Sequence, residues 1–202
     1  MLLGVREQRA AERRQERKEK RQKKQQAERT LRSIMNENMD VSYASLFPEA
    51  REMERHFILH IGPTNSGKTY DAVQDLKMAE HGIYLGPLRL LAYEQFERLN
   101  GDGFPTNLIT GEERQIIPGA LLQASTIEMA RLDEVYDVAV IDEAQMIADP
   151  DRGGAWTRAM LGLQAKVIHV CLANLAEDVI KRVIRDCGDP YEVVRHERQT
   201  PL

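Results

Sequence analysis

The sequence has few cysteines and no long apolar run, and both shortages exclude whole classes of protein. Only two of its 202 residues are cysteine, Cys171 and Cys187, and they form no C-x-x-C pair. Two separated cysteines cannot build a disulfide framework or a zinc ribbon, so we expect a reducing compartment. No apolar stretch approaches the ~20 residues that a bilayer-spanning helix needs, so we expect no membrane partner.

Charge is distributed unevenly along the chain. Residues 1–33 hold 12 Lys or Arg and 5 Glu, a net charge of +7, whereas the remainder has a net charge of −11. The first segment therefore predicts a basic helical arm, ordered or disordered, which is either a solvated helix or an electrostatic tether for nucleic acid. Residues 34–54 are expected to be a linker or a capping segment.

The first residues also bear on location. The opening apolar stretch is too short for the core of a signal peptide, and the arm is richer in acidic residues than mitochondrial transit peptides are. We therefore expect a cytoplasmic, bacterial-type protein in preference to one of the mitochondrial matrix.

A glycine-rich segment fits the pattern G-x-x-x-x-G-K-[ST] in full. It follows an apolar run at residues 57–61, which predicts a buried strand, and precedes a helical pattern at 70–79. Strand, turn and helix start together predict a phosphate cradle for ATP, because backbone N–H groups and the positive helix end face the phosphates. Lys68 would reach the β- and γ-phosphates, and Thr69 would hold Mg²⁺. The residues expected to bind the nucleotide are Gly62, Pro63, Thr64, Asn65, Ser66, Gly67, Lys68 and Thr69.

An acidic pair supplies the second half of such a site. The apolar run at residues 138–141 leads directly into Asp142 and Glu143. We expect Asp142 to bind Mg²⁺ directly or through water, and Glu143 to position and deprotonate the attacking water.

Apolar runs and helical patterns alternate from residue 55 to the end. Strands are predicted at 57–61, 82–85, 106–109, 120–124, 138–141, 166–172 and 191–194, and the main further helices at 89–99, 154–164 and 176–187. This alternation predicts an α/β fold of the P-loop NTPase type, with a mostly parallel sheet covered by helices on both faces. The carboxyl ends of the strands, and the two motifs with them, would lie along one edge.

Six segments follow one another in a characteristic order: residues 62–69, 86–92, 110–113, 125–129, 142–147 and 152–159. Together they resemble a known family, over residues 55 to 175. They look like the first RecA-like domain of the RNA helicases of the mitochondrial-degradosome type, in the DExH branch of superfamily 2. The resemblance implies ATP-driven movement along nucleic acid, with RNA favoured over DNA.

The resemblance also assigns contacts to nucleic acid. Small hydroxyl residues, glycine N–H groups and an arginine at strand ends suit backbone phosphates, although each is also an ordinary helix start or cap on its own. The residues concerned are Arg89, Thr110, Gly111, Ser125 and Thr126.

Two positions connect or support these motifs. Gln145 stands at the position of the His that gives the DExH group its name. The resemblance implies that Gln145 links the ATP site to the residues that contact the nucleic-acid strand. Lys68, Glu143 and Gln145 are the residues expected to be catalytic. For Trp156, the single tryptophan, partial burial is expected in preference to stacking on a base.

Two departures from the pattern concern coupling and rate. The Ser-Ala-Thr type motif expected after the strand at 166–172 reads Cys171-Leu172-Ala173-Asn174 here, which puts the coupling of hydrolysis to movement in doubt. No second RecA-like domain is recognisable, so such a domain or a partner chain would have to supply arginine fingers. Because these contribute on the order of 10³–10⁵ in rate, we expect slow hydrolysis and no unwinding from this chain alone.

Two other functions compete with the helicase interpretation. A thymidine-kinase-like phosphotransferase has a similar length and phosphate loop, but usually carries the four-cysteine zinc site that this chain cannot build. A non-enzymatic, nucleotide-switched RNA-binding module would use the basic arm without a motor.

Overall fold

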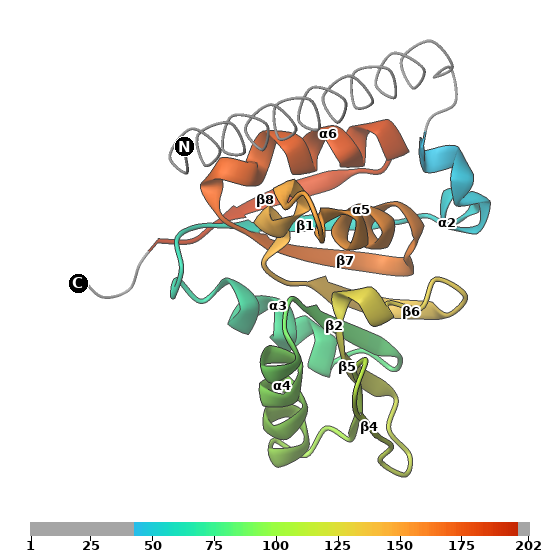
Figure 1. Cartoon of the computed structure of the whole chain (residues 1–202), viewed down its shortest axis with the longest axis vertical. Coiled ribbons are helices and arrows are strands. Elements are labelled where there is room, and N and C mark those ends of the chain that lie inside the picture. The colour runs from blue at the N-terminus through green and yellow to red at the C-terminus, as the bar shows by residue number, and fades with distance from the viewer. Residues whose placement is uncertain (1–42, 198–202) are drawn as a thin grey trace, which may run out of the picture. The chain divides into compact units, whose positions relative to one another are not determined.

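A computed structural model describes residues 43–197 of the chain (Figure 1). The basic arm expected at 1–33 lies outside the described residues, as does the first part of the segment expected at 34–54. Within the described part, no helix combines the length and apolar character needed to cross a membrane.

Strands and helices alternate along the described chain. The strands are β1 (His56–Ile61), β2 (Gly82–Gly86), β3 (Thr106–Ile109), β4 (Arg114–Gln115), β5 (Leu122–Thr126), β6 (Val135–Ile141), β7 (Gln164–Leu172) and β8 (Tyr191–Arg195). The α-helices are α2 (Pro48–Glu52), α3 (Lys68–Lys77), α4 (Arg89–Gly101), α5 (Gly153–Gly162) and α6 (Glu177–Cys187). Short 3₁₀ helices are η1 (Tyr43–Leu46), η2 (Ile127–Met129), η3 (Ala144–Ala148) and η4 (Asn174–Ala176).

The strands form one sheet in the order β4-β3-β5-β2-β6-β7-β1-β8. All neighbouring pairs are parallel except β3 and β4, where Leu108 lies opposite Gln115. The expected α/β fold with a mostly parallel sheet is confirmed. β4 was not expected, because two residues are too few to show an apolar period.

Helices cover both faces of the sheet, with α3 and α4 on one side and α5 and α6 on the other (Figure 1). The alternation of side chains on β2 shows why. Ile83 and Leu85 pack in the core under α5 and α6, whereas Tyr84 between them packs in the core under α3 and α4. A central strand that is buried on both faces reads as a continuous apolar run, as the sequence of β2 does.

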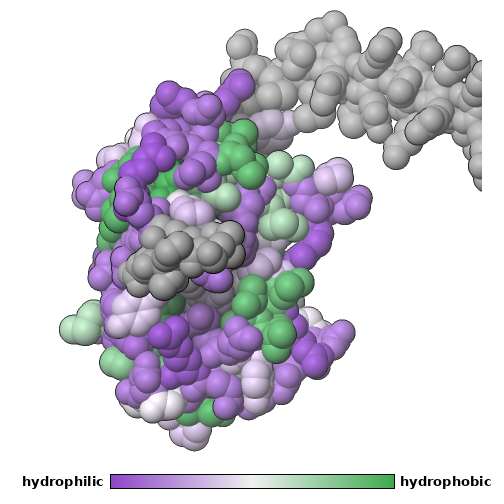
Figure 2. Space-filling model, turned by 90° about the vertical axis from the view of Figure 1, so that its left-hand side faces the viewer, coloured by the Kyte–Doolittle hydropathy of each residue, from purple (hydrophilic) through white to green (hydrophobic). Residues whose placement is uncertain are grey.

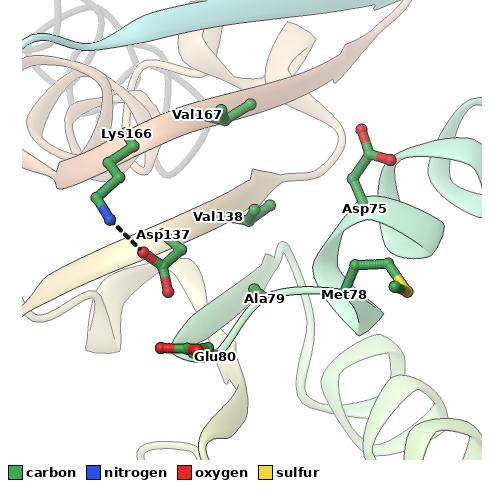
Figure 3. A pocket seen from close by; sticks show the side chains of 8 residues that line it. All are labelled: Asp75, Met78, Ala79, Glu80, Asp137, Val138, Lys166 and Val167. Carbon is green, nitrogen blue, oxygen red and sulfur yellow. Dashed lines mark hydrogen bonds and ion pairs between the residues drawn. The ribbon is translucent and has the colours of Figure 1, made fainter.

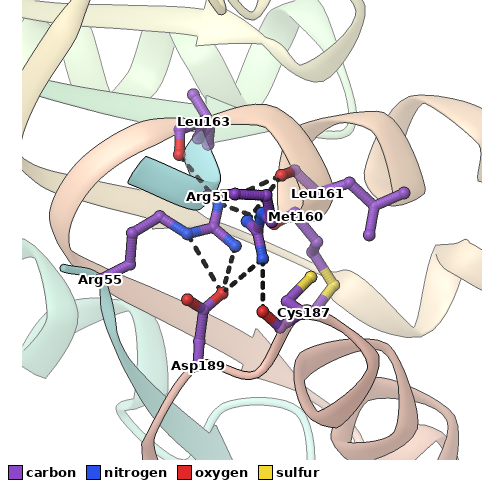
Figure 4. Close-up of polar contacts among 7 residues, drawn as sticks. All are labelled: Arg51, Arg55, Met160, Leu161, Leu163, Cys187 and Asp189. Atoms are coloured by element: carbon purple, nitrogen blue, oxygen red, sulfur yellow. Dashed lines mark hydrogen bonds and ion pairs between the residues drawn. The ribbon is translucent and has the colours of Figure 1, made fainter. Parts of the chain in front are cut away.

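The described part of the segment before β1 packs against this body through two arginines (Figure 4). Arg51 donates to the carbonyl oxygen of Leu161 at 3.0 Å, and the buried Arg55 donates to that of Leu163 at 2.9 Å. Both arginines also contact the carboxylate of Asp189, which follows α6. The boundary expected at residue 55 therefore divides a polar network that joins residues 51 and 55 to the ends of α5 and α6. Whether the segment before it is a linker or a capping segment stays a prediction.

Candidate functional site

The glycine-rich loop connects the end of β1 to the start of α3. Asn65 and Gly67 both have positive φ, 60° and 85°, and α3 begins directly afterwards at Lys68. A Cβ atom at Gly62 would lie 2.4 Å from the carbonyl oxygen of His196, so only glycine fits there. The Ser66 hydroxyl donates to the Pro63 carbonyl oxygen at 2.8 Å and closes the turn.

This loop lines a hollow of about 210 Å³. Residues 64–70 form most of its wall, and Glu143 lies across from them. The Lys68 ammonium donates to the carbonyl oxygens of Gly62 at 2.9 Å and Pro63 at 2.5 Å. These carbonyls hold the lysine beside the loop, where an anion with better acceptors can replace them.

Asp142 ends β6 and meets the loop directly. The Thr69 hydroxyl donates to Asp142 Oδ1 at 3.0 Å, although the two residues lie 73 positions apart in the chain. The backbone N–H of Glu143 donates to the same oxygen at 2.9 Å. A hydroxyl oxygen and a carboxylate oxygen thus lie side by side, and oxygen atoms of these kinds are the ligands that Mg²⁺ prefers.

The carboxylate of Asp142 is only 5% exposed, and a residue that the sequence analysis did not single out supports it from within the core. Tyr84 of β2 donates its hydroxyl to Asp142 Oδ2 at 2.8 Å. Burial raises the pKa of Asp142, while the hydrogen bonds from Tyr84 and Thr69 act in the opposite direction. Burial also raises the pKa of Tyr84, and the neighbouring Asp142 raises it further. Tyr84 is therefore a neutral donor to an acidic group.

Trp156 of α5 supports the same residue through the backbone. Its side chain is fully buried, and its indole N–H donates to the carbonyl oxygen of Asp142 at 3.0 Å. Burial is thus more complete than the partial burial expected, and the ring is not available to stack on a base.

Glu143 and Gln145 connect the acidic pair to the end of β7. Glu143 has a positive φ of 49°, and its carboxylate accepts a hydrogen bond from the Gln145 side-chain amide. The oxygen of that amide accepts from the backbone N–H of Ala173 at 3.2 Å. In the Cys-Leu-Ala-Asn segment the contact to Gln145 is therefore made by a backbone N–H, which residues other than Ser or Thr can equally provide.

Of the five residues expected to contact nucleic acid, Arg89, Thr110 and Gly111 come together at one place. Arg89 at the start of α4 forms an exposed ion pair with Glu112 of the turn after β3. Thr110 is buried, and its hydroxyl accepts a hydrogen bond from the Glu113 backbone N–H at 3.0 Å. Thr110 therefore stabilises the turn from its buried side, while Gly111 and Glu112 are exposed to solvent.

Ser125 and Thr126 lie at the end of β5, with different exposure. Ser125 is fully buried, and its hydroxyl accepts a hydrogen bond from the Gln123 side chain at 2.7 Å. A surface contact from the Ser125 side chain does not fit this position, because the side chain points into the protein. Thr126 is half-buried and precedes η2.

Three histidines that the sequence analysis did not single out form a hydrogen-bonded row near the loop. His60 of β1 is hydrogen-bonded to His169 of β7 at 2.9 Å and to His196 after β8 at 3.0 Å. Asp75 Oδ2 lies 3.2 Å from His169 Nε2, and Asp71 Oδ2 lies 3.7 Å from His196 Nδ1. Both aspartates belong to α3, so the row joins β1, β7 and the residue after β8 to the helix that begins at Lys68.

A larger hollow, of about 520 Å³, lies at the opposite edge of the sheet (Figure 3). It is lined by the end of α3, the following turn and the first residues of β6 and β7, with Lys166 donating to Asp137 at 2.7 Å. No sequence motif contributes to it. The smaller hollow is therefore the one that the sequence motifs line.

The side of the molecule that carries the glycine-rich loop is mostly hydrophilic, with separate apolar groups (Figure 2). Exposed apolar side chains that follow strand ends include Leu88, Leu90 and Leu175. Among the described residues no group of three or more His, Cys, Asp or Glu could hold a metal ion. A magnesium ion at Thr69 and Asp142 would need phosphate oxygens or water to complete its shell.

Comparison with known proteins gives one consistent family. A family model described as the DEXQ-box helicase domain of Suv3 matches residues 44–196. The chain is 51% identical over 160 residues to the ATP-dependent RNA helicase SUPV3L1, mitochondrial, of Gallus gallus, covering 77% of this chain and 20% of the relative. It is 47% identical over 159 residues to the ATP-dependent RNA helicase DExH18, mitochondrial, of Arabidopsis thaliana, covering 79% of this chain and 20% of the relative.

Solved structures agree on the fold. A hypothetical ATP-dependent RNA helicase from Sulfolobus tokodaii superposes with a TM-score of 0.56 at 16% identity, covering 83% of this chain and 56% of that one. The helicase domain of Hef from Pyrococcus furiosus gives a TM-score of 0.50 at 18% identity, covering 79% and 38%. At these identities the likeness shows the fold alone.

These comparisons overturn one expectation and restrict another. A bacterial-type cytoplasmic location is wrong, because the relatives at 47–51% identity are named as mitochondrial. The chain spans about a fifth of the length of these relatives. The match to a helicase domain favours the helicase interpretation over the thymidine-kinase-like one.

Proposed function

The chain belongs to the family of Suv3-type DEXQ-box helicase domains, and from this we propose that it is the ATP-binding domain of an ATP-dependent RNA helicase. The observation that carries the proposal is the hydrogen bond between Thr69 and Asp142. It brings the phosphate loop and the acidic strand end together at one hollow, where a magnesium-bearing triphosphate can contact both.

Lys68, Thr69 and Asp142 divide the binding of this ligand. In the proposed complex, Lys68 would exchange the carbonyl oxygens of residues 62 and 63 for phosphate oxygens, while backbone N–H groups of residues 64–69 would face the phosphates. Thr69 and Asp142 would hold Mg²⁺, which neutralises charge on the phosphates. The presence of two oxygen donors 3.0 Å apart supports this assignment.

Glu143 and Gln145 are proposed to act on the reaction. Glu143 lines the hollow, which supports the proposal that its carboxylate would orient and deprotonate a water molecule beside the phosphates. Gln145 bonds both the Glu143 carboxylate and the Ala173 N–H. A shift of the segment after β7 would therefore reach Glu143 through one side chain.

The proposed RNA contact lies at the ends of β2, β3 and β5. Arg89 is exposed and paired with Glu112, which is also exposed, and such surface pairs contribute about 0–1 kcal/mol. A strand phosphate can therefore take the place of Glu112 as the partner of Arg89. Gly111 and Thr126 would add polar contacts, and Thr110 would act by shaping the turn.

The wider activity is proposed from the relatives. They are named as ATP-dependent RNA helicases and as mitochondrial, and we propose both properties for the protein to which this chain belongs. A second RecA-like domain or a partner chain would supply arginine fingers. Without one, this chain should bind ATP with Mg²⁺ and hydrolyse it slowly.

Two substitutions test the division of labour. Lys68→Ala should abolish ATP binding, because the phosphates lose their cationic partner, whereas Lys77→Ala near the other end of α3 should not. Glu143→Gln should keep ATP binding and stop hydrolysis, because the water loses its base. Equal loss of binding in the Lys68 and Glu143 variants, measured by equilibrium titration, would refute the assignment.

A further inference from the structure

Tyr84 places a hydroxyl in the aliphatic core, at the acidic group of the proposed nucleotide site. Its oxygen lies 2.8 Å from Asp142 Oδ2. Thr69 and the Glu143 backbone N–H both bond the other oxygen, Oδ1, at 3.0 and 2.9 Å. Among residues 43–197, Tyr84 is thus the hydrogen-bond donor that holds Oδ2.

The ring of Tyr84 is itself held in place. Its side chain is fully buried, and in the sheet it lies opposite Ala124 on one side and Val140 on the other. A Cβ atom at Gly86, two residues along the strand, would lie 3.0 Å from Tyr84 Cε1 and 3.2 Å from its hydroxyl oxygen. The glycine that ends β2 therefore leaves the space in which the hydroxyl reaches Asp142.

A carboxylate with donors on one oxygen only can rotate, because the terminal torsion of an aspartate has broad minima. Donors on both oxygens fix its plane. Here they fix it with Oδ1 turned to the hydroxyl of Thr69, the second residue of α3, beside the phosphate loop. Hydrogen bonds to the far side of metal-binding carboxylates commonly affect metal affinity by 10–100-fold.

We propose that Tyr84 is a positioning residue for magnesium at this site: its hydroxyl holds Asp142 Oδ2 so that Oδ1 faces Thr69 and the bound ion. This inference rests on the proposed function and deepens it. Tyr84 is fully buried and its hydroxyl donates to Asp142, so it would act only through Asp142.

The test compares Tyr84→Phe with Tyr136→Phe. Both tyrosines are buried in the same sheet and both hydroxyls donate to a carboxylate, but Tyr136 bonds Glu134 and packs in the core on the other face. Binding of a fluorescent ATP analogue is titrated with Mg²⁺, and binding without Mg²⁺ is measured in EDTA. We expect Tyr84→Phe to raise the Mg²⁺ concentration for half-maximal effect by about 10-fold, with Mg²⁺-free binding unchanged. Tyr136→Phe should match the wild type.

Each outcome is decisive. If the wild type binds the analogue and Tyr84→Phe shows the wild-type Mg²⁺ dependence, the positioning role is overturned while the proposed function stands. If the affinity for the ATP analogue falls by the same factor with and without Mg²⁺, Tyr84 has only a structural role and the inference is again overturned. If the wild type itself shows no Mg²⁺-dependent binding, the proposed function fails and the inference with it.

A second variant covers the case in which Tyr84→Phe does not fold. Gly86→Ala keeps the hydroxyl but crowds it, since the new Cβ would lie 3.0 Å from the ring. It should also raise the Mg²⁺ requirement, by less than Tyr84→Phe. A folded Gly86→Ala protein with the wild-type requirement would count against the role of Tyr84.

Discussion

Asp189→Asn should destabilise the domain strongly, because it removes the carboxylate that neutralises a buried arginine (Figure 4). The Arg55 side chain is 0% exposed and that of Asp189 is 9% exposed. Arg55 Nε lies 3.1 Å from Asp189 Oδ2, and Arg51 contacts the same oxygen at 3.3 Å. Removing one partner of a buried pair typically costs about 3–5 kcal/mol, since it leaves an uncompensated charge.

The carbonyl oxygens around Arg55 reduce the loss of stability that the substitution is expected to cause. Its guanidinium also donates to the carbonyl oxygens of Met160, Leu161 and Leu163 at 3.1, 3.3 and 2.9 Å. These acceptors remain in the variant, so we expect a loss near the lower limit, about 3 kcal/mol. In a domain of this size that corresponds to a fall in Tm of about 6–12 °C.

Urea denaturation followed by circular dichroism measures the loss directly. Asp186→Asn is the matched control, because Asp186 is an exposed aspartate three residues earlier on α6, and its replacement should change stability by less than about 0.5 kcal/mol. A loss below 1 kcal/mol for Asp189→Asn would refute the reasoning. It would mean that this network does not hold residues 43–54 against the rest of the domain.

Three further predictions concern pH, RNA and the environment of the tryptophan. Burial and the neighbouring His169 and His196 lower the pKa of His60 from 6.5 to about 4, so the unfolded chain takes up a proton in this window before the folded one. The free energy of unfolding should therefore fall as the pH falls from 6.5 towards 4, by about 1–2 kcal/mol after allowance for solvent screening, and His60→Gln should remove that part of the slope in urea titrations. Arg89→Ala should weaken binding to single-stranded RNA and reduce the salt slope by about 0.7, whereas Arg98→Ala on the same helix should leave the slope unchanged. Binding of ATP with Mg²⁺ should change the intrinsic fluorescence of Trp156, because its indole bonds the Asp142 carbonyl, and an unchanged spectrum on saturation would contradict that coupling.

The fold and the main elements of the site could be predicted because they depend on local patterns. Continuous apolar runs such as 138–141 predict central parallel strands, and strand ends of a parallel sheet share one edge. That rule places Lys68, Thr69 and Asp142 along the same edge. The separation along the chain does not matter, because the sheet order places β6 and β1 on either side of β7.

What could not be predicted depends on the direction and partner of single side chains. Ser125 and Thr126 both lie at the end of β5. Because successive side chains of a strand point to opposite faces, the Ser125 hydroxyl points inwards, to the Gln123 side chain. Tyr84 reads as an ordinary apolar strand residue, and only the register of β2 beside β6 shows that it reaches Asp142. A hydroxyl in a strand otherwise made of Gly, Ile and Leu was the one signal available.

The most direct test of the central claim is a calorimetric titration of the whole chain with ATP, with and without Mg²⁺. The site predicts saturable binding of one ATP per chain that is tighter with Mg²⁺, because Thr69 and Asp142 then add their oxygens to the grip of Lys68 and the loop. Absence of any binding heat, at every Mg²⁺ and salt concentration tried, would contradict the account.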